Sequence, residues 1–301
     1  MKISIITTSY NYAQYIEEAI NSIINQIHTD WELIIVDDGS SDNSVEIIKS
    51  YCEKDKRIKL FQQPQNKGLK EALLLGVNNA TGDWIAFLES DDIFAPDNLL
   101  KKFKIIEKYP KVKLIYNKVD FIIYDEPNSK RAKHFGDTQK KLAKKTFPKY
   151  MFYKFYINNQ ILTFSSVMIQ AKLLKSIDFN TPVDTLLDWW LWIHAAYKND
   201  FYYINEELTS WRLHEKSYIS KKKRKIQLPL QVQAYWDVYK KNSKPKKLLF
   251  FITFSFILLF IVYIYRFTRK FLVEIIRRIK FILFGHTLKV RDIFYLFFDK
   301  K

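Results

Sequence analysis

The sequence predicts an α/β fold in which a mostly parallel central sheet is flanked by helices. Two observations carry this prediction. Short β-branched apolar runs alternate with segments of helical period through the first hundred residues, and polar residues end these runs abruptly. Ligands in such sheets sit at the carboxyl ends of the strands. The polar residues at those ends are therefore the first candidates for a functional site.

The first half of the chain alternates regularly. Strands are expected at 2–7, 32–36, 57–61 and 83–88. Helices are expected to begin near Ala13, at Ser41 or Asp42, after 66–68 and at Pro96-Asp97. The spacing of the last helix places Leu100, Phe103 and Ile106 on its inner face.

The second half is less regular. We expect one or two strands at 113–124, followed by a polar and basic loop or insertion at 125–149 and an aromatic-rich stretch at 150–157. A strand is then expected at 163–169, a helix at 186–197 and a last strand at 201–204.

Polar residues follow three of the predicted strands. They are Thr8-Ser9-Tyr10, Asp37-Asp38 and Glu89-Ser90-Asp91-Asp92. Parallel strands bring such ends to one edge of a sheet. Hard divalent cations take carboxylate oxygens and bridge them to phosphates, so 89–92 is a candidate metal site. The alternative is a solvated acidic turn that caps the next helix.

Composition narrows the partners. The chain has 301 residues, of which 48% are hydrophobic, enough for one large domain or one domain with an appendage. Its net charge of +17, concentrated in the second half, suggests nucleic acid, acidic lipid or a phosphorylated substrate. No nucleic-acid motif accompanies the basic runs. The single cysteine, Cys52, excludes an internal disulfide.

Seven motifs, in order, resemble inverting family 2 glycosyltransferases of the GT-A fold, of the membrane-anchored bacterial type. The motifs lie at 5–26, 32–42 (ELIIVDDGSSD), 66–68 (NKG), 82–92 (GDWIAFLESDD), 165–169 (SSVMI), 186–192 (LLDWWLW) and 211–220 (WRLHEKSYIS). The resemblance covers roughly residues 2–220. It implies a Rossmann-like GT-A domain, with a nucleotide-binding half at about 1–110 and an acceptor half at about 111–220.

The resemblance also implies a role for each matching position. Asp38 would accept a hydrogen bond from the nucleotide base, with Thr8 and Tyr10 nearby. Asp91, in the place of the family's Asp-x-Asp motif, would bind Mg²⁺ or Mn²⁺ held by the donor diphosphate, with Asp92 sharing this role. Asp188 matches the general base. Arg212 and His214 match the position that closes on diphosphate and metal. Lys67 is either a phosphate contact or a solvated loop lysine.

Three features depart from the family pattern. Glu89 occupies the first acidic position of the Asp-x-Asp motif, from which it could still reach the ribose, or the metal through water; Ser90 lies between the two acids. Leu187 stands where an acidic residue usually precedes the base. Trp190 and His194 replace an acidic residue and an arginine on the same helix. The last two changes concern the acceptor end more than the donor end.

The C-terminal third predicts a membrane anchor. Residues 248–265 form an uncharged run of 18 residues, long enough at about 1.5 Å per residue to cross a bilayer core. A basic linker at 221–247 precedes it, and a basic amphipathic tail at 266–301 follows. Basic flanks on both sides leave a single span and a re-entrant anchor open.

The sequence therefore predicts a metal-dependent glycosyltransferase at the inner or plasma membrane, with its catalytic domain in the cytoplasm. It would transfer a sugar from a nucleoside diphosphate sugar, with a UDP-sugar as the first choice, and with inversion. The acceptor would be a membrane lipid or lipid-linked glycan, such as a lipid-linked oligosaccharide or a cell-envelope polysaccharide precursor. One alternative is a polyprenyl-phosphate glycosyltransferase. Another, of a different class, is a non-catalytic membrane-bound nucleotide-binding protein.

Overall fold

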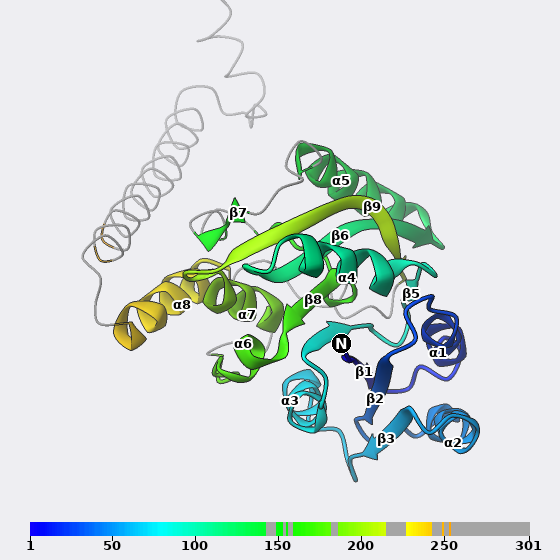
Figure 1. Ribbon diagram of the computed structural model, residues 1–301. Helices are drawn as coiled ribbons and strands as arrows, with labels where there is room; N and C mark the ends of the chain where they lie inside the picture. The colour runs from blue at the N-terminus through cyan, green and yellow to red at the C-terminus, as the bar shows by residue number, and fades with distance from the viewer. Residues whose placement is uncertain are drawn as a thin grey trace, which may run out of the picture. The chain divides into compact units, whose positions relative to one another are not determined.

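A computed structural model describes residues 1–142, 149–152, 155, 159–181, 186–214, 227–242, 249 and 253 (Figure 1). The chain divides into two compact units, Met1–Val238 and Tyr239–Lys301. The account below concerns the first unit.

A single sheet runs through this unit. Its nine strands, within the described residues, follow the order β3-β2-β1-β4-β8-β6-β9-β5, and β7 pairs with β9. The strands are β1 (Ile3–Ser9), β2 (Trp31–Asp37), β3 (Ile58–Gln62), β4 (Trp84–Phe87), β5 (Ile93–Phe94), β6 (Val112–Ile123), β7 (Lys149–Tyr150), β8 (Val167–Gln170) and β9 (Asp200–Leu213).

Strand direction differs between the two halves of the sheet. All pairs within β3-β2-β1-β4 are parallel, as predicted. Beyond them β8 runs antiparallel to both β4 and β6, and β5 and β7 run antiparallel to β9, whereas β6 and β9 are parallel. The expectation of a mostly parallel sheet is thus correct for the first four strands and for the β6–β9 pair, and wrong for the pairings of β8, β5 and β7. The sheet as a whole is mixed.

Helices flank the sheet. They are α1 (Ile16–Ile24), α2 (Ser44–Lys54), α3 (Leu69–Asn79), α4 (Asn98–Lys108), α5 (Glu126–Leu142), α6 (Ala171–Lys175), α7 (Leu187–Ala196) and α8 (Gln227–Lys241), with a short 3₁₀ turn at Phe164–Ser166. Alternate strand residues divide between the faces: Ile5 joins the core formed with α1, whereas Ile6 contacts α3. A Cβ on Gly76 of α3 would lie 2.6 Å from the Ile6 side chain, so glycine permits this close approach.

Helix α4 begins one position out of the expected register. Asn98, Leu99 and Lys102 are its fully buried side chains, whereas Leu100 and Phe103 are partly exposed. The Asn98 amide donates hydrogen bonds to the Leu208 carbonyl and the Thr209 hydroxyl. This anchor fixes the first turn against β9 and turns the next position inward. Burial lowers the pKa of Lys102 to about 7.

Two segments expected to lack regular structure contain helices. Residues 126–142, within the predicted loop, form α5, and residues 227–241, within the predicted basic linker, form α8. The predicted strand at 201–204 is part of a longer strand, β9, which also contains the start of the 211–220 motif as far as Leu213.

Within the residues described, no helix combines the length and the apolar character needed to cross a bilayer. The predicted membrane segment 248–265 lies outside the described residues, apart from Leu249 and Thr253, and the predicted tail 266–301 lies entirely outside them.

Candidate active site

A cavity of about 590 Å³ opens at the carboxyl ends of β1, β2 and β4. Segments far apart in sequence line it: the ends of these strands, the start of α3, one face of α5 and the end of β9. The lining residues are Thr8, Ser9, Tyr10, Asn11, Tyr12, Asp38, Asn66, Gly68, Leu69, Ala72, Glu89, Ser90, Asp91, Asn128, Arg131, Phe135, Trp211 and Leu213. Six of the predicted site residues therefore share one cavity: Thr8, Tyr10, Asp38, Glu89, Ser90 and Asp91.

Asp38 joins two loops at one end of this cavity. Its Oδ1 accepts a hydrogen bond from the Lys67 amide at 2.7 Å, and its Oδ2 accepts one from the Gly68 amide at 2.8 Å. The next residue, Gly39, has φ +76°, and a Cβ there would lie 2.7 Å from the Gln65 backbone. The Lys67 side chain is exposed and does not line the cavity. Lys67 reaches the site through its backbone alone.

The acidic cluster splits in two. Asp91 lines the cavity, and its Oδ2 lies 2.9 Å from His214 Nε2. Asp92 is fully buried and does not line the cavity. Its carboxylate accepts hydrogen bonds from the Ser165 hydroxyl at 2.6 Å and the Arg212 amide at 2.9 Å. This geometry disagrees with a metal shared between Asp91 and Asp92; Asp92 instead braces the loop that presents Asp91.

Glu89 lies on the cavity with few donors. Its Oε2 accepts a hydrogen bond from the Thr163 hydroxyl at 2.8 Å. Burial and the charges of Asp91 and Asp188 raise the pKa of Glu89 to about 7, although the Thr163 bond opposes them. Burial, then the neighbouring acids, also raises the pKa of Asp92. A cation in the cavity would relieve this accumulation of negative charge.

Asp91 and His214 suit a divalent cation that takes most of its ligands from the phosphates of a substrate and from water. Asp91 offers a carboxylate oxygen and His214 an imidazole nitrogen at hydrogen-bonding distance from each other. No group of three His, Cys, Asp or Glu side chains suited to a metal occurs among the residues that the structure describes. Mg²⁺ and similar cations are held by one or two protein groups plus substrate phosphates and water. Asp91 and His214 meet that requirement, with phosphate oxygens left to complete the shell.

Asp188 occupies the first turn of α7. The helix starts after Leu186, a non-glycine residue in the left-handed region at φ 75°. The Asn159 amide donates a hydrogen bond to Asp188 Oδ2 at 2.7 Å. Burial raises the pKa of Asp188 to about 6, against the hydrogen bonds that it accepts. Asp188 does not line the cavity, but it is near enough for its charge to raise the pKa of Glu89.

Arg212 does not line the cavity, and protein acceptors occupy its guanidinium. Its Nη2 donates to Glu18 at 2.6 Å, its Nε donates to the Asp91 carbonyl at 2.8 Å, and its Nη1 donates to the Tyr124 hydroxyl. Each of the three guanidinium nitrogens of Arg212 thus already donates to a protein acceptor. This arrangement disagrees with the predicted contact between Arg212 and the diphosphate. The side chain ties α1 to the loop that carries Asp91.

Several lining residues were not singled out from the sequence. Tyr12 lies two residues after Tyr10, so its position beside the polar end of β1 was a signal that could have identified it. Its pKa is raised by burial and by the charges of Asp91 and Glu89. The sequence does not identify the lining residues of α5, which are Asn128, Arg131 and Phe135. The polar and basic composition of 125–149 predicts a loop or insertion, so no helix face could be assigned there. His194 pairs instead with Asp237 of α8 at 3.0 Å, away from the cavity lining.

Comparisons with known proteins agree with this arrangement. A sequence model described as glycosyl transferase family 2 matches residues 4–177. The chain is 32% identical over 248 residues to the uncharacterized glycosyltransferase MJ1057 of Methanocaldococcus jannaschii, covering 80% of each protein.

Two solved structures share the fold. One is Staphylococcus aureus TarS 1–349 in complex with UDP-GlcNAc, with a TM-score of 0.61 and 19% identity; the match covers 79% of this chain and 67% of TarS 1–349. The other is the mannosyltransferase PcManGT of Pyrobaculum calidifontis in complex with GDP-Man and Mn²⁺, with a TM-score of 0.55 and 18% identity. That match covers 79% of this chain and 64% of PcManGT.

Proposed function

The chain belongs to glycosyl transferase family 2, and from this premise we propose that it transfers a sugar from a nucleoside diphosphate sugar to an acceptor hydroxyl. The observation that carries the proposal is the single cavity that joins Asp38 at the end of β2 to Glu89 and Asp91 beyond β4. A nucleotide sugar needs both regions, a polar recess for the base and an acidic, cation-binding region for the diphosphate.

UDP is the first donor nucleotide to test. Each Asp38 oxygen already accepts one backbone N–H. A carboxylate oxygen has a second lone pair, with which Asp38 can accept the N–H of uracil, with Thr8 and Tyr10 on the same wall. The TarS complex with UDP-GlcNAc supports the choice, and the PcManGT complex makes GDP the nucleotide to compare with it.

Asp91 and His214 are the residues that would hold Mn²⁺ or Mg²⁺. When bound, the cation stabilises the negative charge that develops on the departing diphosphate. Asp92 and Arg212 fix the Asp91 loop through hydrogen bonds to the backbone and to Ser165. The Mn²⁺ in the PcManGT complex supports this cofactor.

Asp188 is the proposed general base. With a pKa of about 6, its carboxyl group is mostly ionised at neutral pH and is a better proton acceptor than an ordinary aspartate. Asn159 holds one of its oxygens and orients the other. A single base that deprotonates the attacking hydroxyl allows direct displacement, with inversion at the sugar carbon.

We also propose that the acceptor is a membrane lipid or a lipid-linked glycan at the cytoplasmic face of the inner or plasma membrane. The uncharged segment 248–265 and its basic flanks support this. Ultracentrifugation of a lysate of cells that express the full chain tests the proposed membrane association. Recovery in the membrane fraction after carbonate washing is expected, and recovery in the supernatant would contradict the membrane assignment.

The catalytic proposal is tested by incubating the purified full chain with Mn²⁺, UDP-sugars and a membrane extract as the acceptor source. Sugar transfer and UDP release are expected. Asp188→Asn should abolish transfer while Mn²⁺-dependent UDP binding persists. Asp120→Asn, the same change at an exposed position of β6, is the matched control and should remain active. Normal transfer by Asp188→Asn would show that another group is the base.

A further inference from the structure

Helix α5 contributes a wall of the cavity that neither the motifs nor the proposed mechanism uses. Asn128, Arg131 and Phe135 are spaced three and four residues apart, so they lie on one face of the helix, and all three line the cavity. Arg131 is the one cationic side chain among the described lining residues; the acidic ones are Asp38, Glu89 and Asp91.

Packing fixes the orientation of this helix. The Phe135 ring lies 5.1 Å from the Trp211 ring, and Ala132 is buried in the same cluster. Near the other end, the buried Gln139 side chain both donates to the Val119 carbonyl at 3.0 Å and accepts from the Val119 amide at 2.6 Å. These contacts with β6 and β9 hold α5 in one rotational setting. The setting turns Arg131 toward the cavity.

The start of the helix is fixed as well. Asp125 accepts hydrogen bonds from the Asn128 backbone N–H at 2.8 Å and the Asn128 side-chain amide at 2.7 Å. The remaining Asn128 oxygen accepts one hydrogen bond from Arg131 Nη1 at 3.3 Å. Arg131 is thereby steadied on the cavity wall with most of its donors unused.

Arg131 lacks the partner that a half-buried guanidinium requires. No described carboxylate lies within ion-pair distance of it, although three acidic residues share its cavity. Arginine stays protonated, so it cannot shed its charge to avoid desolvation. Arg212 is the contrast, because Glu18, Tyr124 and the Asp91 carbonyl take its donors.

We propose that Arg131 binds the diphosphate of the donor nucleotide, in the cavity that it lines together with Asp91. The proposal rests on the function proposed above. A guanidinium presents parallel N–H donors that match two phosphate oxygens. Arg131 then performs the role that the family resemblance assigned to Arg212, from a helix that the family motifs do not include.

Binding of UDP and of uridine to the full chain in Mn²⁺, measured by calorimetry, tests this inference. Arg131→Ala should weaken UDP binding by about 10- to 100-fold, the range for a charge-assisted hydrogen bond. Uridine binding should stay unchanged, because uridine carries no phosphate. Arg131→Lys, which keeps the charge and loses the paired donors, should recover part of the UDP affinity.

Lys133→Ala is the matched control, since it removes a positive charge from an exposed position of the same helix. It should leave both affinities unchanged. Equal UDP affinity in wild type and Arg131→Ala would overturn the inference, as would an equal loss of UDP and uridine affinity, which would indicate a distorted cavity. A wild-type protein that binds no nucleoside diphosphate at all, GDP included, would instead refute the proposed function.

Discussion

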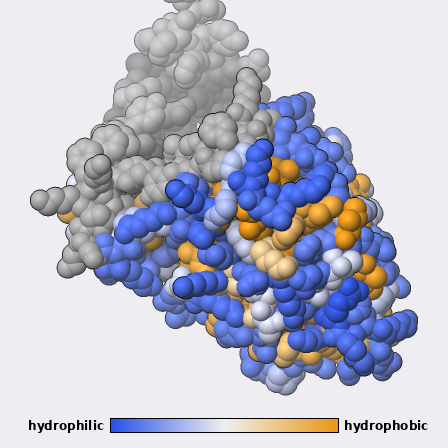
Figure 2. All heavy atoms as spheres, in the orientation of Figure 1, coloured by the Kyte–Doolittle hydropathy of each residue, from blue (hydrophilic) through white to orange (hydrophobic). Residues whose placement is uncertain are grey.

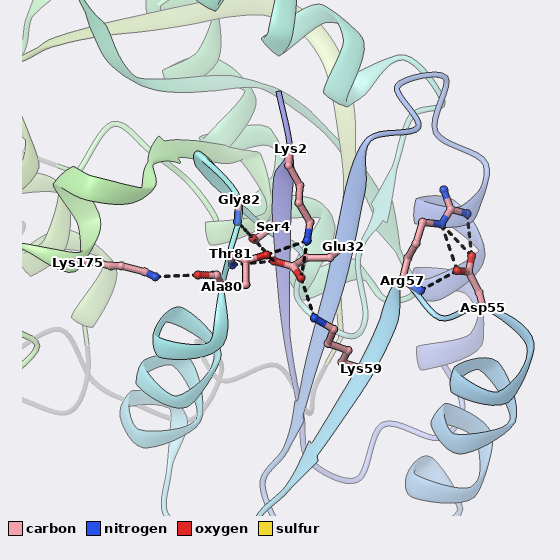
Figure 3. Close-up of polar contacts among 10 residues, drawn as sticks. All are labelled: Lys2, Ser4, Glu32, Asp55, Arg57, Lys59, Ala80, Thr81, Gly82 and Lys175. Atoms are coloured by element: carbon pink, nitrogen blue, oxygen red, sulfur yellow. Dashed lines mark hydrogen bonds and ion pairs between the residues drawn. The ribbon is translucent and has the colours of Figure 1, made fainter.

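The two edges of the parallel half-sheet each carry a glutamate, Glu32 within β2 and Glu89 just beyond β4, and the two lie in opposite environments. At the amino-terminal edge, Glu32 of β2 is 1% exposed. Figure 3 shows its carboxylate surrounded by Lys2, Ser4, Lys59 and Thr81. Its Oε1 accepts hydrogen bonds from the Ser4 hydroxyl and from the Thr81 amide and hydroxyl, all at 2.7 Å. Its Oε2 accepts from Lys2 and Lys59, both at 3.0 Å. Burial alone would raise the pKa of Glu32, but these donors outweigh it and lower the pKa far below its ordinary value of 4.5.

At the carboxyl-terminal edge, the Glu89 side chain has one described donor, Thr163, and acidic neighbours, and its pKa is raised to about 7. A fully buried glutamate within β2 is thus saturated with donors, whereas a partly buried glutamate just beyond β4 is left short of them. The saturated edge contributes to stability. The other edge keeps unsatisfied negative charge, which is the environment that a metal–diphosphate complex requires.

The largest effect that sharpens this comparison is expected at Asp188. Asp188→Asn should reduce kcat by about 10²- to 10⁴-fold, the range for removal of a general base. It should also leave the midpoint of thermal unfolding unchanged or higher, because desolvation disfavours the charged form of Asp188 more than its hydrogen bonds stabilise it. Parallel measurements of transfer rate and thermal unfolding check both parts. A marked fall in the unfolding temperature would mean that this edge, too, is structural.

Glu32→Gln should show the reverse behaviour. The amide nitrogen would face either the Ser4 and Thr81 donors or the two lysine ammonium groups. A loss of about 2–4 kcal/mol in the free energy of unfolding is expected, with kcat unchanged at temperatures where the variant is folded. Urea denaturation measures the loss. Unchanged stability would remove the distinction between the two edges.

The pH dependence should separate the edges in the wild-type protein. Because the folded-state pKa of Glu32 lies below 4.5, its contribution to stability is complete above that pH and is lost as the pH falls below it. Because the pKa of Asp188 is about 6, kcat should fall progressively below pH 6, while the protein is still folded. Rate and unfolding profiles that fall together near pH 4.5 would contradict this separation.

The smallest effect is expected for Lys59→Ala. Lys59 is 46% exposed, and Lys2 still pairs with the same Glu32 oxygen. A destabilisation of at most about 1 kcal/mol should result, diminishing as salt is added. A loss as large as that of Glu32→Gln would show that the two lysines are not interchangeable partners. Urea denaturation at two salt concentrations makes the comparison.

The sequence predicted the parallel half-sheet well because its evidence is local. Apolar runs and polar strand ends identify β1, β2 and β4, and one topological rule brings Asp38, Glu89 and Asp91 together. The family resemblance added two residues to the predicted site, Asp188 as the general base and His214 as a metal contact. The antiparallel direction of β8 leaves no trace in periodicity, since alternation has no direction.

What the sequence did not predict depends on tertiary contacts. The helical state of α5 follows from Phe135 and Gln139 docking on β6 and β9, because most helical stability in proteins comes from such packing. Similarly, the opposite fates of Asp91 and Asp92 depend on Ser165, which is distant in sequence. Adjacent acidic residues look alike until the segment that supplies their donors is in place.

Arg212 has a consequence for the kinetics of ligand capture. Its bonds to Glu18, Tyr124 and the Asp91 carbonyl hold the loop that carries Asp91 in place. The loop therefore need not be ordered at the moment of binding, and less conformational entropy is lost when the nucleotide enters. Nucleotide association should accordingly follow a single exponential that rises linearly with ligand concentration, without the slow phase of a loop that closes afterwards.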